Sequence, residues 1–214
     1  MIRIKNLFLK YTREYFALYD ISFNVEKNER VAFLGDEDSG KTSLIRIITK
    51  LEEPTSGEVY IKDIPLKKLN LLHDIQAGYL PATPVLLENK TVYENLKYIL
   101  SQRKLSKSEI ESKINQALIN FSLERIRDEK VKNLKLLDKY IVSFARLLFR
   151  DLELLIIDNI FEKLPPHERE EMIKLVESFL DGKKLTLIFA LREKELAKRF
   201  GLKVITFDNG SIVK

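Results

Sequence analysis

The residues best suited to chemistry form a short loop near the N-terminus, in a glycine and lysine pattern that binds phosphate. Its eight positions are Gly35, Asp36, Glu37, Asp38, Ser39, Gly40, Lys41 and Thr42. The loop follows an apolar run at 31–34 and precedes an apolar, helix-like stretch that begins at Ser43. In such a loop, backbone N–H groups wrap a β-phosphate, and the N-terminus of the next helix adds positive charge. Lys41 then reaches the β- and γ-phosphates, and the Thr42 hydroxyl ligates Mg²⁺. Residues 35–43 are therefore the predicted nucleotide site.

Three carboxylates stand inside this loop, beside the place of a polyanion. They belong to Asp36, Glu37 and Asp38. Two like charges ~7 Å apart repel by about 2 kcal/mol at an effective dielectric near 20. If the side chains point to solvent, most of this cost vanishes. We therefore expect the loop to bind a nucleotide more weakly than a loop without these carboxylates, and to depend more on Mg²⁺.

A second acidic position has the form of a metal ligand. Asp158 follows the apolar run 154–157, as in a Walker B strand, and ligands sit at the carboxyl ends of strands in parallel sheets. The carboxylate of Asp158 can hold Mg²⁺ through water, opposite Thr42. Thr42 and Asp158 are the predicted metal site.

The surrounding pattern alternates strands with helices, which predicts an α/β domain with a mainly parallel sheet. Alternating or continuous apolar runs predict strands at 2–4, 21–25, 31–34, 58–62, 154–157 and 185–190, and a closing hairpin of 204–207 with 211–213. A capping box of Ser106 and Glu109 starts a helix that runs to about 121, and another helix is expected at 166–180. In the turn at 26–29, Asn28 is the residue that best accepts a left-handed conformation.

The composition is that of an ordinary globular protein and excludes several classes. The 214 residues are 45% hydrophobic and 32% charged, with a dispersed net charge of +5. This dispersal predicts a solvated surface rather than a nucleic-acid partner. The absence of cysteine excludes disulfides and thiolate metal sites. Because no run of ~18 apolar residues occurs, we expect no direct membrane insertion. We expect a cytoplasmic protein, held at the inner face of a membrane through a partner.

Taken together, these segments resemble the ABC (ATP-binding cassette) transporter ATPases from end to end. Besides the phosphate loop and Asp158, the resemblance rests on the segments 17–23, 54–59, 91–96 and 145–148. It implies a P-loop NTPase fold with an N-terminal antiparallel part. It also implies that residues 1–214 form one nucleotide-binding domain, with a helical subdomain inserted at about 92–150. The implied ligands are ATP and Mg²⁺. Tyr11 sits where the family stacks an aromatic ring on adenine, with Tyr15 and Phe16 as rivals.

The sequence departs from the family at the positions that break the terminal phosphate bond. The family signature Leu-Ser-Gly-Gly-Gln falls on Leu134, Lys135, Leu136, Leu137 and Asp138, of which the first alone matches. We expect the two bulky leucines to block close backbone approach to phosphate. Asn159 replaces the catalytic glutamate, Ala82 the loop glutamine, and Arg192 the switch histidine. The two histidines, His73 and His167, lie elsewhere and are expected at the surface. No catalytic residue is therefore assigned.

The leading hypothesis is an ATP-binding, hydrolysis-impaired subunit or regulator of a membrane transport or export complex, with ADP as the alternative ligand. Its implied partners are a second ABC-type nucleotide-binding domain and a transmembrane subunit. An active transporter ATPase could instead use Asn159, Arg192 and Lys135 in new roles. A non-catalytic scaffold for another ATPase and a small-molecule phosphotransferase are further alternatives.

Overall fold

The computed structural model describes residues 1–12, 14–71 and 74–213. The chain divides into two compact units, each built from segments that are distant in sequence. The first contains Met1–Tyr79, Leu152–Asn159 and Phe179–Lys214, and the second contains Leu80–Asp151 and Ile160–Ser178. The expectation of one domain over 1–214, with a helical insertion at about 92–150, stays a prediction.

The first unit begins with an antiparallel sheet in the strand order β2-β1-β4-β5. Its strands are β1 (Ile2–Lys10), β2 (Phe16–Val25), β4 (Ser56–Ile61) and β5 (Ile64–Pro65). Strand β1 pairs with β2 on one side and with β4 on the other. The first strand is longer than the alternation at 2–4 predicts, because register shifts after Ile4 interrupt the simple pattern while pairing continues to Lys10.

A second sheet in the same unit carries the phosphate loop, in the order β10-β9-β3-β8-β7-β6. Its strands are β3 (Arg30–Leu34), β6 (Ala77–Leu80), β7 (Leu154–Asp158), β8 (Thr186–Leu191), β9 (Lys203–Asp208) and β10 (Ser211–Val213). Strands β9, β3, β8 and β7 are parallel neighbours. The mainly parallel sheet and the antiparallel N-terminal part are as predicted.

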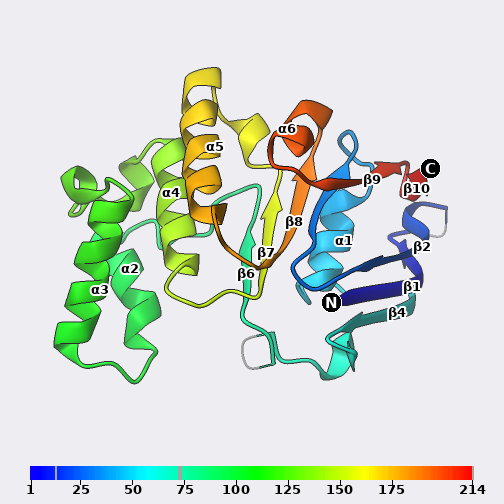
Figure 1. The fold of residues 1–214 in the computed structure, drawn as a ribbon, viewed down its shortest axis with the longest axis horizontal. Coiled ribbons are helices and arrows are strands. Elements are labelled where there is room, and N and C mark those ends of the chain that lie inside the picture. Colours follow the sequence, from blue (N-terminus) through cyan, green and yellow to red (C-terminus); the bar gives the residue numbers. More distant parts are fainter. Residues whose placement is uncertain (13, 72–73, 214) are drawn as a thin grey trace. The chain divides into compact units, whose positions relative to one another are not determined.

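Helix α1 (Lys41–Ile48) lies between the two sheets of this unit (Figure 1). Its apolar side chains join one core cluster with residues of both sheets, and α6 (Lys194–Arg199) follows β8. Every residue of β7 and β8 is buried, which explains their continuous apolar runs. Burial on both faces therefore holds β7 and β8 in place, and the carboxyl ends of these strands lie at the predicted site.

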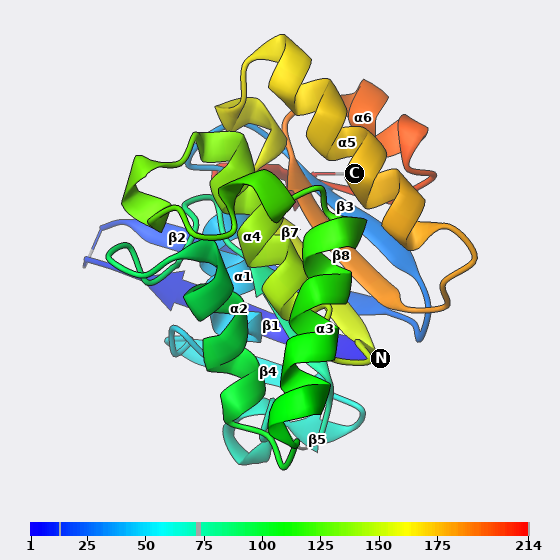
Figure 2. The same cartoon turned by 90° about the vertical axis from the view of Figure 1, so that its left-hand side faces the viewer.

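The second unit is helical. It contains α2 (Val92–Ser101), α3 (Lys107–Asn120), α4 (Leu136–Leu147) and most of α5 (Pro166–Leu180), and Figure 2 shows α2 and α3 side by side. Capping boxes start α2 at Thr91 and α3 at Ser106. In each box the hydroxyl accepts from the backbone N–H of the glutamate three residues later, and the carboxylate of that glutamate accepts from the backbone N–H of the capping residue. Short 3-10 turns at Glu124–Ile126 and Val131–Asn133 lie between α3 and α4, and another at Phe161–Lys163 lies between β7 and α5. Among the described residues, no helix combines the length and apolar character needed to cross a membrane.

Two turns confirm their sequence-based interpretation. Asn28 has φ 63°, and its N–H donates to the Thr186 hydroxyl at 3.0 Å. The final hairpin turns at Asn209 and Gly210, both with positive φ, and pairs Ser211 with Asp208. In both places a residue that tolerates the left-handed region stands where the chain must reverse.

Candidate nucleotide site

The phosphate loop begins where β3 leaves the sheet. Leu34 lies opposite Leu191 of β8, and the Gly35 N–H donates to the Leu191 carbonyl at 3.2 Å. At the far end of the loop, Gly40 caps α1 with φ 97°. A Cβ atom at Gly40 would stand 2.6 Å from the Ala17 carbonyl oxygen. Glycine is therefore required there for both its backbone conformation and the close approach of β2.

The loop closes around the ammonium group of Lys41. The Lys41 side chain is buried, and its Nζ donates to the carbonyls of Gly35 and Asp36 at 2.6 Å each and to the Ser39 hydroxyl at 2.9 Å. The Ser39 hydroxyl in turn donates to the Asp36 carbonyl at 2.8 Å. These bonds fix the loop in a tight turn ahead of the α1 N-terminus. A buried cation beside a helix N-terminus is well suited to a polyphosphate.

The three carboxylates of the loop are exposed to solvent. Asp36, Glu37 and Asp38 are exposed, and Glu37 forms an ion pair with Arg192. Asp38 has φ 59°, so it shapes the turn through its backbone. Because the carboxylates are exposed, solvent and salt screen part of the like-charge repulsion expected from the sequence. These three residues can contribute backbone N–H groups to a phosphate.

Thr42 and Asp158 meet at the carboxyl end of β7. The Thr42 hydroxyl donates to Asp158 Oδ1 at 3.2 Å, and the Tyr79 hydroxyl donates to Asp158 Oδ2 at 3.3 Å. Asp158 is 1% exposed. Burial, and then the negative charge of Asp158, raise the pKa of the Tyr79 hydroxyl, which keeps it a donor.

This pair of oxygen groups fits Mg²⁺. A hydroxyl and a carboxylate are the hard ligands that Mg²⁺ takes, together with phosphate oxygens and water. Within the described residues, no group of three or more His, Cys, Asp or Glu side chains could hold a metal. A metal held by Thr42 and Asp158 would therefore depend on the phosphates of a bound nucleotide.

Tyr11 lies beside the first turn of α1. Its hydroxyl lies 3.2 Å from the Ser43 hydroxyl and donates to Glu52 at 3.0 Å. Its ring is half exposed and stacks on Tyr15, with centroids 6.2 Å apart. The structure thus brings Tyr11 next to the loop and adds Tyr15 to the same aromatic surface. Phe16 instead lies under the Lys10 ammonium.

The residues at the positions expected to drive hydrolysis have surroundings that differ from one another. Asn159 has φ 48°, and its Oδ1 is buried without a hydrogen-bond partner among the described residues. In the helical unit, the carbonyl of Ala82 accepts from the Tyr140 hydroxyl at 2.5 Å. Arg192 pairs with Glu37. None of these contacts provides a carboxylate base for an attacking water.

The segment at the signature position starts α4. Lys135 is its N-cap residue and makes no side-chain capping bond. Leu137 is 6% exposed and packs inside the helical unit, whereas Leu136 is 37% exposed. The expectation that the two leucines block a phosphate stays a prediction; of the two, Leu136 alone presents its side chain to solvent. His167 is exposed as expected, and His73 lies outside the described residues.

Sequence reasoning missed two contributors to the site. Tyr79 contacts Asp158 because β6 is the neighbour of β7, an order that no local pattern reveals. Gly210 donates its N–H to the Ser39 carbonyl at 3.2 Å and accepts from the Tyr19 N–H at 2.8 Å. The turn signal at 208–210 predicted a hairpin but not its contact with the loop.

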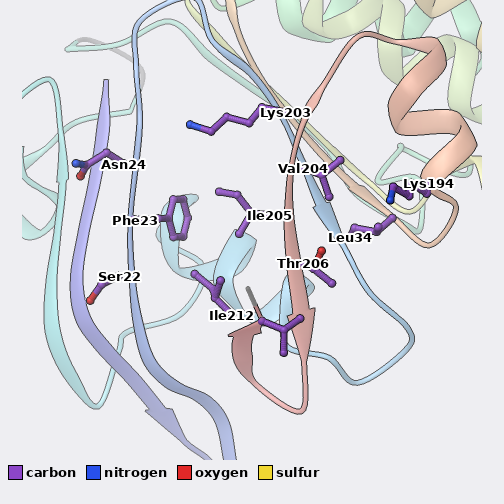
Figure 3. Close-up of a pocket in the computed structure, with 11 residues that line it drawn as sticks. Ser22, Phe23, Asn24, Leu34, Lys194, Lys203, Val204, Ile205, Thr206 and Ile212 are labelled. Atoms are coloured by element: carbon purple, nitrogen blue, oxygen red, sulfur yellow. The ribbon is translucent and has the colours of Figure 1, made fainter.

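A cavity of about 680 Å³ lies elsewhere in the first unit, between β2 and the β9–β10 hairpin (Figure 3). Its lining residues are Ser22, Phe23, Asn24, Leu34, Lys194, Lys203, Val204, Ile205, Thr206, Ile212 and Val213. Lys203 is already paired with Glu29 at 2.9 Å. The cavity shares none of the residues 35–43 and is separate from the phosphate loop.

Two proteins that this chain resembles are named as ATP-binding proteins of import systems. The chain is 31% identical over 202 residues to the methionine import ATP-binding protein of Haemophilus influenzae, covering 92% of this chain and 59% of that protein. It is 29% identical over 204 residues to the molybdate/tungstate import ATP-binding protein of Thermococcus kodakarensis, covering 93% of this chain and 60% of that protein. The chain thus spans about three fifths of the length of these two relatives.

Solved structures share the fold over the whole chain. A bacterial ABC transporter cassette solved as a dimer matches 100% of this chain and 97% of its own, with a TM-score of 0.87 and 24% identity. A Clostridium perfringens protein that is part of an ABC transporter complex matches 100% of this chain and 86% of its own, with a TM-score of 0.83 and 22% identity.

The family model described as ABC transporter matches residues 18–162, which include the phosphate loop, Asp158 and the segment at the signature position. This match covers more than half of the chain and agrees with the ordered set of segments in the sequence. The chain therefore belongs to the ABC transporter ATPase family.

Proposed function

We propose that this chain binds ATP with Mg²⁺ at the loop formed by residues 35–43. The observation that carries the proposal is the joint geometry of Lys41, Thr42 and Asp158. A buried ammonium group lies within the loop, and the Thr42 hydroxyl contacts the Asp158 carboxylate at 3.2 Å. This arrangement places an anion site and a Mg²⁺ position next to each other at the carboxyl end of β7. The exposed Tyr11 and Tyr15 rings beside Ser43 are suited to stacking on adenine.

The same proposal includes impaired hydrolysis. An attacking water needs a base, and Asn159 can orient water but cannot take its proton. Losing one well-placed base or transition-state donor typically lowers the rate by about 10²–10⁴. Ala82 and Arg192 further replace the glutamine and histidine that the family resemblance implies. We therefore expect ATP to bind to the chain and to be hydrolysed only slowly.

The charge around the signature position supports this expectation. Burial raises the pKa of the Asp138 carboxyl, and the negative charges of Glu171, Glu168 and Glu129 raise it further, against the effect of Lys135. Negative charge near the first turn of α4 disfavours an approaching triphosphate. A partner's nucleotide would meet the Lys135 ammonium and several carboxylates here instead of glycine amides.

We further propose that the chain is a nucleotide-gated subunit or regulator of a membrane transport complex. The relatives are named as import ATP-binding proteins, and related cassettes were solved as dimers. A second ABC-type domain and a transmembrane subunit are the proposed partners, which would hold the chain at the cytoplasmic face of a membrane. In the helical unit, the exposed apolar side chains of Val85, Leu87 and Tyr98 offer a docking surface for the transmembrane subunit. Binding alone can shift such a complex between conformations through differential affinity.

Calorimetric titration with Mg-ATP, paired with a phosphate-release assay, tests the proposal. Wild type is expected to bind Mg-ATP, while Lys41→Ala and Asp158→Ala are expected to bind it at least about tenfold more weakly, because each loses charge-assisted contacts. Asp158→Ala should also lose the Mg²⁺ dependence. Phosphate release is expected to stay far below one turnover per second.

Two results would reject parts of the proposal. Phosphate release of several turnovers per second that is lost in Lys41→Ala would show an active transporter ATPase, the alternative that the relatives' names favour. A wild-type chain with no heat of binding and no thermal shift with Mg-ATP would show a scaffold.

A further inference from the structure

Arg192 leaves the sheet next to the phosphate loop. It follows β8, whose last residue Leu191 lies opposite Leu34 and accepts from the Gly35 N–H at 3.2 Å. Parallel pairing of β3 with β8 therefore places residue 192 beside the first residues of the loop. This position follows from the sheet register and not from a chance surface contact.

The Arg192 guanidinium forms an ion pair with the Glu37 carboxylate in the loop. The Arg192 side chain is 34% exposed and that of Glu37 is 69% exposed. On the other side of the same turn, Lys41 binds the carbonyls of Gly35 and Asp36. The first turn of the loop thus contacts two cations, Lys41 of α1 and Arg192, which follows β8.

We propose that Arg192 neutralises Glu37 and thereby strengthens the binding of a nucleoside triphosphate to a loop with three carboxylates. This inference rests on the proposed function and adds a charge control to it. Arg192 is a positioning residue in this role, since it acts through Glu37. A guanidinium group also suits phosphate oxygens, because its planar fork matches both carboxylate and phosphate.

The proposal predicts opposite signs for the two members of the pair. Removing Arg192 alone leaves the Glu37 charge uncompensated beside the polyphosphate, which weakens binding. Removing Glu37 alone takes one negative charge away from the loop beside the polyphosphate, which tightens binding. Removing both leaves the local charge balance unchanged. The effects should be larger for Mg-ATP than for Mg-ADP, because the triphosphate carries more negative charge.

The experiment titrates the full chain with Mg-ATP and with Mg-ADP, in wild type, Arg192→Gln, Glu37→Gln and the double variant. At low salt, Arg192→Gln is expected to bind Mg-ATP about fivefold more weakly and Glu37→Gln about fivefold more tightly. The double variant should return to within about twofold of wild type. All differences should shrink at about 0.5 M salt, where screening is strong.

A distant ion pair of the same unit provides the matched control. Lys62 pairs with Glu153 at 2.5 Å, with exposures of 33% and 37%. Glu153 precedes the strand that Asp158 ends, and five extended residues separate them by about 16 Å. Lys62→Gln and Glu153→Gln should therefore leave the nucleotide affinity within about twofold of wild type.

Other results of this titration would overturn the role of the ion pair or the proposed function. If both single variants weaken binding, the pair acts on the shape of the loop, and the charge control is wrong. If neither single variant changes the affinity, the pair is a surface contact without a role. A gain of affinity in Glu37→Gln cannot come from misfolding, so this variant keeps the test decisive. A wild-type chain that fails to bind Mg-ATP would instead reject the proposed function, and this inference with it.

Discussion

Two helices of this chain begin at positions where the family resemblance implies a phosphate contact, and they begin in opposite ways. Helix α1 starts after Gly40, with the buried ammonium of Lys41 in its first turn. Helix α4 starts after Lys135, with Asp138 in its first turn and a buried Leu137. Both helices carry the same partial positive charge at the N-terminus. A helix dipole alone therefore does not make an anion site; the preceding loop and the charge of the first turn decide it.

This difference indicates that the chain retains the family's phosphate-binding loop and lacks its signature segment. The α1 start keeps the groups that the family resemblance implies for holding a polyphosphate, whereas the α4 start has a leucine packed in the helical unit and a carboxylate in its first turn. The four predictions below test this contrast, from the largest expected effect to the smallest.

Grafting the family signature onto α4 should damage the helical unit. The triple variant Lys135→Ser, Leu136→Gly and Leu137→Gly removes a buried leucine and adds two helix glycines, so we expect a loss of about 4 kcal/mol in the free energy of unfolding. Denaturant unfolding measures this loss. Leu136→Gly alone is the control and should cost about 1 kcal/mol. A folded triple variant with several turnovers per second would break the contrast.

Gly40→Ala should destabilise the first unit by about 3 kcal/mol and abolish Mg-ATP binding. The added Cβ would meet the Ala17 carbonyl oxygen at 2.6 Å, at φ 97°, so a steric clash adds to backbone strain. Gly182→Ala is a matched control, because Gly182 also has positive φ but nothing lies within 4 Å of an added Cβ. The control should lose about 1 kcal/mol and bind normally. Equal losses in thermal unfolding would show that strain alone accounts for Gly40.

Asn159→Glu restores the carboxylate that the family resemblance implies, yet it should not restore fast hydrolysis. Asn159 has φ 48°, and glutamate in this region costs about 1 kcal/mol. Because Ala82 and Arg192 remain, we expect phosphate release to rise less than about tenfold. The assay compares this variant with Asn159→Gln, which has the same length and no charge. A rise of about a thousandfold would mean that one base was the main missing part.

Asp138→Asn should slightly stabilise the helical unit at neutral pH. The Asp138 carboxyl has a pKa above its ordinary value of 3.8 because of burial and neighbouring glutamates. An acid with a raised folded pKa loses stability as pH rises from its unfolded pKa through its folded pKa. The variant lacks this loss, so it should be more stable at neutral pH by less than about 0.5 kcal/mol, given the exposure of the side chain. Below pH 3.8, unfolding curves of the two proteins should coincide; a difference that persists in acid would contradict this account.

Much of the fold and the phosphate loop could be predicted from the sequence because local signals agree with the tertiary structure. The strands β7 and β8 are apolar except for Asp158 and Thr186 because both faces are buried, and Asn28 and Gly210 stand where the backbone needs positive φ. The capping box at Ser106 and the α5 bounds Pro166–Leu180 follow from equally local patterns.

The contacts that complete the site could not be predicted, because they join distant segments through the sheet order. The Tyr79 contact with Asp158 needs β6 beside β7, and the pairing of Glu37 with Arg192 spans 155 positions. The inward direction of Leu137 depends on the rotation of α4 about its axis, which a count of residues from Asp158 does not give. Local pattern thus located the loop, and tertiary structure decided which side chains surround it.

The final hairpin has a practical consequence for work on this protein. Gly210 binds Ser39 on one side and Tyr19 on the other through its backbone, and an added Cβ would lie 2.8 Å from the Ala17 carbonyl oxygen. Deleting or replacing the stretch after Asp208 would therefore remove the hydrogen bond that Gly210 makes to Ser39 in the phosphate loop. Shortened or internally tagged versions could lose ligand binding with every ligand-facing side chain intact, and deletion mapping would then assign the nucleotide site to the wrong end of the chain.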